Sequence, residues 1–157
     1  IRDREKIINN IVGDAIVKEV MSLKLAVKLI ETVEEKAAEM GLAVVVAVSD
    51  ASGRPVAVHC MDGAYHGSFD VAVNKTYTST AFQMSTAKLS RLCQPGQDLY
   101  GLQFSNNGKV MILGGGEPLM VGKTMIGALG VSGGSAQEDS DLAAYGASAL
   151  KEVIKCL

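Results

Sequence analysis

The sequence has few aromatic side chains and no concentration of basic charge. Its 157 residues include three Phe, four Tyr and no Trp, so aromatic residues make up only 4% of the chain. The formal net charge is −2, and Lys and Arg form no block. Proteins that bind nucleic acid rely on a basic surface or on aromatic side chains that stack on bases. We therefore expect no nucleic-acid partner.

Long hydrophobic runs are also lacking. A membrane-spanning helix needs about 20 consecutive apolar residues, and the apolar runs of this chain are far shorter. The first six residues, Ile1 to Lys6, contain five charged side chains and no apolar core of the kind found in signal peptides. The sequence therefore predicts neither a membrane partner nor export.

Cysteine is sparse and unpaired in pattern. Cys60, Cys93 and Cys156 are odd in number, lie far apart and form no Cys-x-x-Cys motif. Such usage is typical of reduced thiols in a cytosolic protein. We therefore expect a cytoplasmic location.

Aliphatic residues and glycine are abundant instead. Hydrophobic residues make up 48% of the chain, and glycine occupies 17 positions, well above its usual share of about 7%. A chain of this length buries roughly 70% of its unfolded surface and forms one domain. We expect a single domain over residues 1–157, in which residues 1–21 form a poorly defined N-terminal extension. Within that extension Ile7, Ile8, Ile11 and Val12 suit a short helix.

Hydrophobic periodicity and turn residues predict the order of the elements. Ser22 is a suitable N-cap for a helix over 23–40, and the S-x-x-E sequence from Ser135 to Glu138 is a capping box that opens a helix ending near Cys156. The other predicted elements are a helix over 69–82 capped by Ser68, a short helix from Ser85 to about Cys93, and strands at 43–48, 55–61, 110–113, 117–121 and 124–131. Short connections make neighbouring strands antiparallel. The order αββααβββα predicts an α/β (α+β) fold with a five-stranded antiparallel sheet flanked by helices.

Glycines gather at two predicted turns. Gly114, Gly115 and Gly116 separate two strands, and Gly133 and Gly134 join a strand to the capped helix. Free backbone amides at a strand-to-helix junction can hold an anion or a carboxylate. Glycine also permits a tight turn with no ligand, and the sequence is compatible with both interpretations.

Histidine occurs only twice. His59 lies on a predicted strand beside Cys60, and His66 lies in a glycine-flanked loop that also contains Asp62 and Gly63. Both histidines with Asp62 would suit a metal site, and either one would suit ligation of a haem iron. A purely structural role for each histidine is the alternative.

Lys75 is the main candidate for an anion contact. It lies on the predicted 69–82 helix, which also carries Thr76, Thr78, Ser79 and Thr80. Hydroxyl-rich helices are unusual because β-branched residues have modest helix propensity, so these side chains are expected to line a polar pocket or an interface. Lys75 either binds an anionic ligand or is simply solvated.

Several of these segments together resemble the GlcG/HbpS family, which includes the C-terminal domain of PduO proteins. The resemblance spans roughly residues 22–155. It rests on the segments Val48 to Gly53, Met61 to Ala64, Ser68 to Ala72 with Lys75 and Phe82, Gly114 to Leu119, Ile126 to Gly134, and Asp139. The chain departs from the family at the helix that commonly reads Lys-Ala-x-Thr-Ala, which here reads Lys75-Thr76-Tyr77-Thr78-Ser79.

The resemblance implies a profilin-like arrangement of three layers, a homo-oligomer, and a ligand-binding role. HbpS is a haem-binding, redox-linked protein, and PduO C-terminal domains also bind haem and accompany an adenosyltransferase domain in cobalamin-dependent diol breakdown. Members of the GlcG type accompany glycolate utilisation. The first clear helix of this chain contains no histidine, so a haem ligand would have to come from His59 or His66.

The leading hypothesis is an oligomeric protein that binds a small molecule, with haem or another tetrapyrrole as the cofactor and His66 as the metal ligand. The same hypothesis associates the protein with diol, glycerol or glycolate metabolism. One alternative is an enzyme acting on a small hydroxy acid or aldehyde, with Lys75 holding the substrate and His66 transferring a proton. Another is a structural or assembly partner without a ligand. The predicted cofactor-binding residues are His66, His59, Asp62, Gly63, Lys75, Gly115, Gly116, Gly133 and Gly134.

Overall fold

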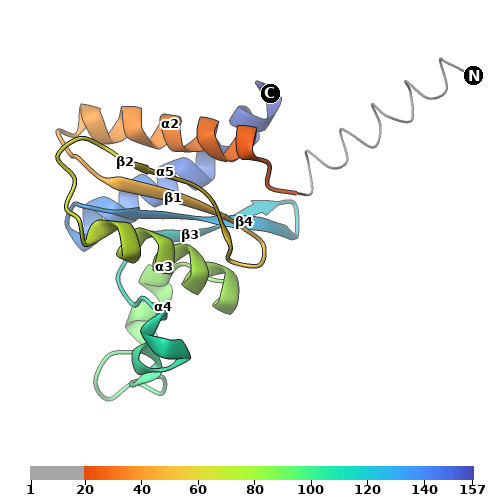
Figure 1. Ribbon diagram of the computed structural model, residues 1–157. Helices are drawn as coiled ribbons and strands as arrows, with labels where there is room; N and C mark the ends of the chain where they lie inside the picture. Colours follow the sequence, from red (N-terminus) through yellow and green to blue (C-terminus); the bar gives the residue numbers. More distant parts are fainter. Residues whose placement is uncertain (1–19) are drawn as a thin grey trace, which may run out of the picture.

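The computed structural model describes residues 20–157 (Figure 1). The short helix predicted at Ile7 to Val12 lies outside the described residues. The elements, in chain order, are α2 (Leu23–Glu39), β1 (Val45–Asp50), β2 (Pro55–Cys60), α3 (Ser68–Phe82), α4 (Thr86–Leu92), two 3-10 turns (Leu102–Phe104 and Asn106–Gly108), β3 (Gly116–Val121), β4 (Thr124–Ser132) and α5 (Ala136–Lys155).

The strands form one antiparallel sheet in the order β2-β1-β4-β3. The β1–β2 and β3–β4 pairs are hairpins, as their short connections predict. The central pairing joins β1 to β4, with Val45 opposite Ser132 and Asp50 opposite Gly127. This long-range pairing brings the beginning of α5 beside the first half of the chain.

Helices cover both faces of the sheet (Figure 1). Helices α2 and α5 pack on one face and on each other, whereas α3 packs on the opposite face. The alternation of side chains along β1 follows this division: Val46 and Val48 belong to the large core beneath α2 and α5, and Ala47 belongs to a small cluster with Ala72 of α3. The predicted mixed α/β fold, with helices flanking an antiparallel sheet, is confirmed.

The prediction of a fifth strand at 110–113 is wrong, and so is the element order that contained it. Residues 110–113 have no strand pairing. Val110 instead packs with Leu89 and Cys93 in a cluster beneath α4, and the backbone N–H of Met111 donates to Thr78 Oγ1 at 2.8 Å. An apolar run of four residues fits a buried loop as well as a strand, and here α3 supplies the hydrogen-bond partner that a strand would have supplied.

Most of the predicted helix starts are confirmed. The side chains of Ser22 and Ser85 cap α2 and α4, and Ser135 forms the predicted capping box with Glu138 at the start of α5. The exception is Ser68, which is the first residue of α3 rather than its cap; Gly67 occupies the cap position. Between residues 20 and 157, no helix combines the length and hydropathy that crossing a membrane would require.

Candidate functional site

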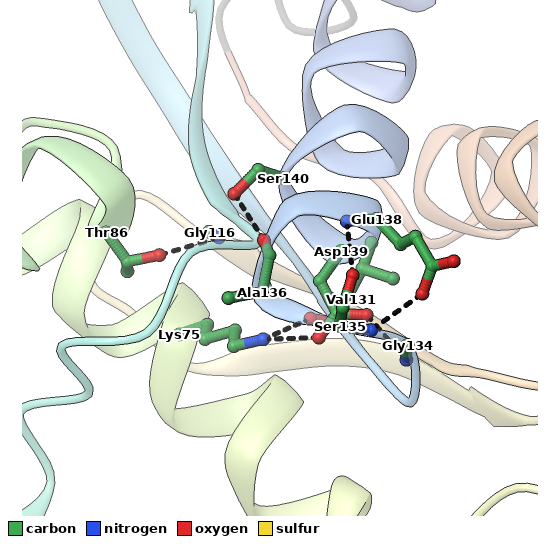
Figure 2. A network of polar contacts seen from close by, with 10 residues as sticks. All are labelled: Lys75, Thr86, Gly116, Val131, Gly134, Ser135, Ala136, Glu138, Asp139 and Ser140. Atoms are coloured by element: carbon green, nitrogen blue, oxygen red, sulfur yellow. Dashed lines mark hydrogen bonds and ion pairs between the residues drawn. The ribbon is translucent and has the colours of Figure 1, made fainter.

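A buried ion pair links α3 to α5 at the end of β4 (Figure 2). Lys75 is only 1% exposed. Its Nζ atom lies 2.9 Å from Asp139 Oδ2 and donates to the carbonyl oxygen of Val131 at 2.6 Å. Lys75 is thus neither solvated nor free for a ligand at these contacts, because two protein oxygens already accept hydrogen bonds from its ammonium group.

Asp139 also closes the junction between β4 and α5. Its second carboxylate oxygen, Oδ1, accepts a hydrogen bond of 2.9 Å from the backbone N–H of Gly134 (Figure 2). The Glu138 carboxylate accepts from the N–H of Ser135 at 2.7 Å. The sequence predicted that amides at this junction would suit an anion; the structure pairs these two amides with carboxylates of the same chain.

The predicted glycine turn lies directly against this ion pair. Gly115 has φ +117°, and a Cβ atom there would lie 2.8 Å from Lys75 Nζ and 2.6 Å from the carbonyl oxygen of Val131. The N–H of Gly116 donates to Thr86 Oγ1 at 2.8 Å. Close approach of backbone to buried polar groups explains the glycines here, and Gly133 similarly lies against the backbone of Ala43.

Burial lowers the pKa of the Lys75 ammonium from its ordinary value of 10.5, and the charge and hydrogen bond of Asp139 oppose this shift. The direction means that desolvation of the ammonium outweighs its attraction to the carboxylate. Because desolvation offsets the attraction between the two charges, the presence of this buried pair does not by itself indicate added net stability.

The hydroxyl groups of α3 are mostly satisfied within the protein. Thr76 Oγ1 donates to the carbonyl oxygen of Val73 at 2.7 Å, and Thr78 Oγ1 donates to that of Asn74 at the same distance. Ser79 is different: within residues 20–157, its buried Oγ atom has no hydrogen-bond partner. The hydroxyls of Thr76 and Thr78 therefore donate to carbonyl oxygens of their own helix. Ser79 Oγ is a buried oxygen without a partner and lies next to Gly116.

Replacing Ser79 by alanine is expected to raise the free energy of unfolding by about 1 kcal/mol, because it removes a buried hydroxyl that gains no hydrogen bond on folding. Urea denaturation measures the change. The matched control is Thr86→Val, which removes the acceptor of the Gly116 N–H and is expected to lower stability by about 1–3 kcal/mol. A loss of stability in Ser79→Ala would contradict the expectation.

The two histidines lie in different surroundings. His59 Nδ1 is 2.8 Å from Glu34 Oε1 of α2, so its side chain is on the face covered by α2 and α5. Lys75 belongs to α3, on the other face of the sheet. The structure therefore does not bring His59 together with Lys75 and the glycine turns.

His66 lies in the exposed loop before α3 and is followed one turn later by Phe69. Within residues 20–157 no side-chain hydrogen bond is made to its imidazole, and its neighbours Tyr65 and Phe69 are 74% and 45% exposed. Asp62 and Gly63 form the turn after β2, where Gly63 has φ +85°. Lys75 is about 10 Å further along the axis of α3 than Ser68, so His66 and Lys75 occupy separate positions.

These placements separate the predicted site into parts. Lys75, Gly115 and Gly134 contact Asp139, and Gly116 lies against the backbone of Lys75. By contrast, His66 lies with Asp62 and Gly63 in the surface loop, and His59 pairs with Glu34. In the described part of the chain no three His, Cys, Asp or Glu side chains gather as a metal site, so the alternative of two histidines with Asp62 is not formed there. A pocket of about 220 Å³ is lined by residues that include Gly114, Arg91 and Ser140.

Sequence reasoning missed the partner of Lys75. Asp139 directly follows the Glu138 of the capping box, and an acidic residue in the first turn of a helix is ordinarily explained by the helix dipole. The sequence does show each residue as a separate feature: Lys75 lies in a predicted helix of small polar residues, and Asp139 follows a glycine-rich strand end. Nothing in the spacing of the two, 64 positions apart, indicates that they meet.

Comparison with known proteins identifies relatives over most of the chain. A family described as "Haem degrading protein HbpS-like" matches residues 21–148. An uncharacterized 15.0 kDa protein from the dhaT-dhaS intergenic region of Citrobacter freundii is 39% identical over 123 residues, which are 78% of this chain and 87% of that protein. The corrinoid adenosyltransferase PduO of Salmonella typhimurium is 39% identical over 109 residues, or 69% of this chain, but the match covers only 32% of PduO.

Solved structures show the same fold. The Klebsiella pneumoniae protein ORFY is 34% identical with a TM-score of 0.82, covering 88% of this chain and 93% of ORFY. The structure described as a PduOC:heme complex is 35% identical with a TM-score of 0.79, covering 83% of this chain and 94% of PduOC. At these identities and coverages the likeness extends to nearly the whole of the described chain.

Proposed function

This chain belongs to the HbpS-like family, and from that premise we propose that it is an oligomeric protein that binds haem, with His66 as a ligand to the iron. The relative PduOC, of which the match covers 94%, is described in complex with haem. The observation in this chain that carries the proposal is the state of His66: its imidazole is exposed and, within residues 20–157, takes part in no hydrogen bond. A neutral imidazole with a free nitrogen is the protein ligand that haem iron takes most commonly in oxygen-binding proteins.

The surroundings of His66 suit a large planar group. Tyr65 and Phe69, one and three positions from it in the sequence, are 74% and 45% exposed, and aromatic rings provide flat apolar contact area for a tetrapyrrole. His59 is less suitable, because one of its ring nitrogens is engaged by Glu34 at 2.8 Å. When bound, the iron would supply redox chemistry, and this chain's residues would bind and orient the macrocycle.

The alternative of an enzyme that holds a substrate carboxylate on Lys75 gains no support from the geometry, because the Lys75 ammonium is buried against Asp139 and Val131. We further propose that the protein acts in the cytoplasm as a homo-oligomer, in diol, glycerol or glycolate metabolism. Its three cysteines carry free thiols, and a reducing compartment such as the cytoplasm would maintain them. The relative from the dhaT-dhaS region, which is 39% identical, supports the metabolic part of the proposal.

A haem titration of the purified protein tests the proposal. We expect a Soret band that shifts on binding, and we expect His66→Ala to weaken binding by at least about tenfold, which corresponds to about 1.4 kcal/mol. His59→Ala is the matched control and is expected to bind as the unmodified protein does. Native mass spectrometry of the same samples reports bound haem and subunit number.

Two results would contradict the proposal in different ways. Equal affinities for the unmodified protein and His66→Ala would remove His66 as the ligand. The absence of any Soret change in the unmodified protein would remove haem as the cofactor.

A further inference from the structure

Strand β2 forms an open edge of the sheet. It is an outer strand and pairs only with β1 within residues 20–157. The register of the two strands skips Val56, so the regular part of β2 runs from Ala57 to Cys60. This segment contains no proline and no lysine, which natural proteins commonly place on an edge strand to block further pairing. An edge strand without such residues is a template for another strand.

The outward backbone groups of this edge belong to Val58 and Cys60. The N–H of Met61 donates to the carbonyl oxygen of Val44 at 3.1 Å, and hydrogen-bonded pairs alternate along an antiparallel ladder. His59 therefore directs its N–H and C=O groups toward β1, whereas Val58 and Cys60 direct theirs away from it. Outside the helices and strand ladders, no backbone hydrogen bond within residues 20–157 involves either of these two residues.

The opposite edge of the sheet, at β3, is closed. The N–H of Val131 in β4 donates to the carbonyl oxygen of Gly115 at 2.8 Å, so by the same alternation Gly116 and Pro118 face outward. The N–H of Gly116 donates to Thr86 Oγ1 of α4, and proline has no N–H to offer. Pairing with a further strand is therefore blocked at β3 and open at β2.

We propose that β2 pairs antiparallel with β2 of a second copy of this chain, around a two-fold axis at His59. Val58 of each copy then lies opposite Cys60 of the other copy, and their outward N–H and C=O groups bond reciprocally. The strand is complementary to itself, as a two-fold interface requires, and the two sheets join into one. This inference rests on the homo-oligomer of the proposed function and names the surface that forms it.

The side chains of β2 favour a second copy as the partner. His59 would lie opposite the same residue of the other copy, and Glu34 Oε1 is 2.8 Å from its imidazole. A carboxylate thus offsets the charge that each histidine would bring to the axis. On the face covered by α3, Val58 packs beside the small cluster that contains Ala72. It would meet the exposed Cys60 of the other copy, and this contact removes apolar surface from water.

A proline on the edge strand tests the pairing in the full chain. Val58→Pro removes an N–H that faces away from β1, so the existing ladder keeps its hydrogen bonds. Val58→Thr is the matched control, because it keeps both the N–H and the β-branched shape. Native mass spectrometry over a dilution series measures dissociation of the oligomer. We expect Val58→Pro to dissociate at a protein concentration at least about tenfold higher than the unmodified protein does, and Val58→Thr to behave as the unmodified protein.

A disulfide at the axis tests the same contact without proline. The exposed thiols are removed as Cys60→Ser and Cys156→Ser, and His59→Cys is added. Directly opposite residues of a non-hydrogen-bonded pair have Cα atoms about 4.5 Å apart, which a disulfide can span. Lys123→Cys, exposed in the β3–β4 turn, is the control. Under mild oxidation we expect His59→Cys to form a disulfide-linked dimer at least about tenfold faster, because pairing raises the effective concentration of the two thiols.

The possible failures are distinguishable. A monomeric unmodified protein would remove both the homo-oligomer of the proposed function and this interface. An oligomer that dissociates equally in Val58→Pro and Val58→Thr would overturn the interface alone, and so would equal rates of dimer formation in His59→Cys and Lys123→Cys. If far-ultraviolet circular dichroism shows that Val58→Pro is unfolded, the disulfide rates decide. Absence of haem binding in an oligomer joined at β2 would refute the proposed cofactor and leave the interface standing.

Discussion

Lys75→Met is expected to lower the free energy of unfolding by about 3–5 kcal/mol, because it leaves the buried carboxylate of Asp139 without its partner. The methionine side chain is similar in length to lysine, so the loss of packing is small. Asp139 is only 4% exposed, and its remaining hydrogen bond, from the Gly134 N–H, cannot neutralise it. Urea denaturation of both proteins at neutral pH measures the difference.

A double variant separates the loss of charge pairing from other effects. Lys75→Met/Asp139→Asn contains no buried charge at this site, and the asparagine oxygen still accepts from the Gly134 N–H. We expect it to be more stable than Lys75→Met alone by about 2 kcal/mol, because replacing both members of a buried pair is tolerated far better than removing one. The single variant Asp139→Asn completes the comparison. If the stability losses of Lys75→Met and Asp139→Asn add up to the loss of the double variant, the two charges do not interact.

The lowered pKa of Lys75 makes a related prediction about pH. Between the lowered pKa of the folded state and the ordinary value of 10.5, the unfolded chain binds more protons at this lysine than the folded protein does. The free energy of unfolding therefore rises with pH across this window through Lys75. Lys75→Met lacks this contribution, so the difference in stability between the two proteins is expected to widen as pH increases. A difference that narrows would contradict the direction of the shift.

Gly130→Ala is the second substitution expected to have a large effect. Gly130 lies in the second half of β4, opposite Ala47 of β1, on the face covered by α3. A Cβ atom there would overlap the carbonyl oxygen of Ala72 and meet Thr76 Cγ2 at 3.0 Å. Because the obstructing atom is helix backbone, α3 would have to move away from the sheet. We expect a loss of at least about 3 kcal/mol, at the upper end of the cost of overpacking a core.

The control is Gly67→Ala, at the cap position of α3. Gly67 has φ −63°, and no heavy atom lies within 4 Å of a Cβ built there. Alanine is therefore sterically compatible at this position, and we expect a change within about 0.5 kcal/mol. Comparable losses in the two variants, measured by urea denaturation, would show that the close approach of α3 to β4 does not limit stability.

Local sequence patterns predicted the elements that have strong local signals. The capping box at Ser135 and the N-caps at Ser22 and Ser85 fixed the starts of three helices, because capping depends on residues within one turn. The error at 110–113 has the opposite cause. Whether a short apolar run becomes a strand depends on a neighbouring strand with which it can pair. Here Val110 packs under α4 and the N–H of Met111 donates to Thr78 instead.

The candidate site was predictable only in part. The sequence singled out Lys75 and the glycines at 115, 116 and 134, which do meet in the structure. It gave Lys75 two roles, anion binding or solvation, and the structure shows a third: pairing with Asp139 in the interior. That pairing depends on how α3 and α5 approach the end of β4 from opposite sides, which no local pattern records.

The shortage of aromatic residues illustrates the same division. By itself the sequence determined that this is an aliphatic, glycine-rich chain with alternating helices and hairpins, because composition and hydrophobic periodicity act over a few neighbouring residues. Only the tertiary structure decided where its few aromatic rings lie, and Tyr65 and Phe69 are at the surface beside His66 rather than in the core. Likewise, only the β1–β4 pairing and the packing of α3 determined which glycines are required, since close approach is set by elements distant in sequence.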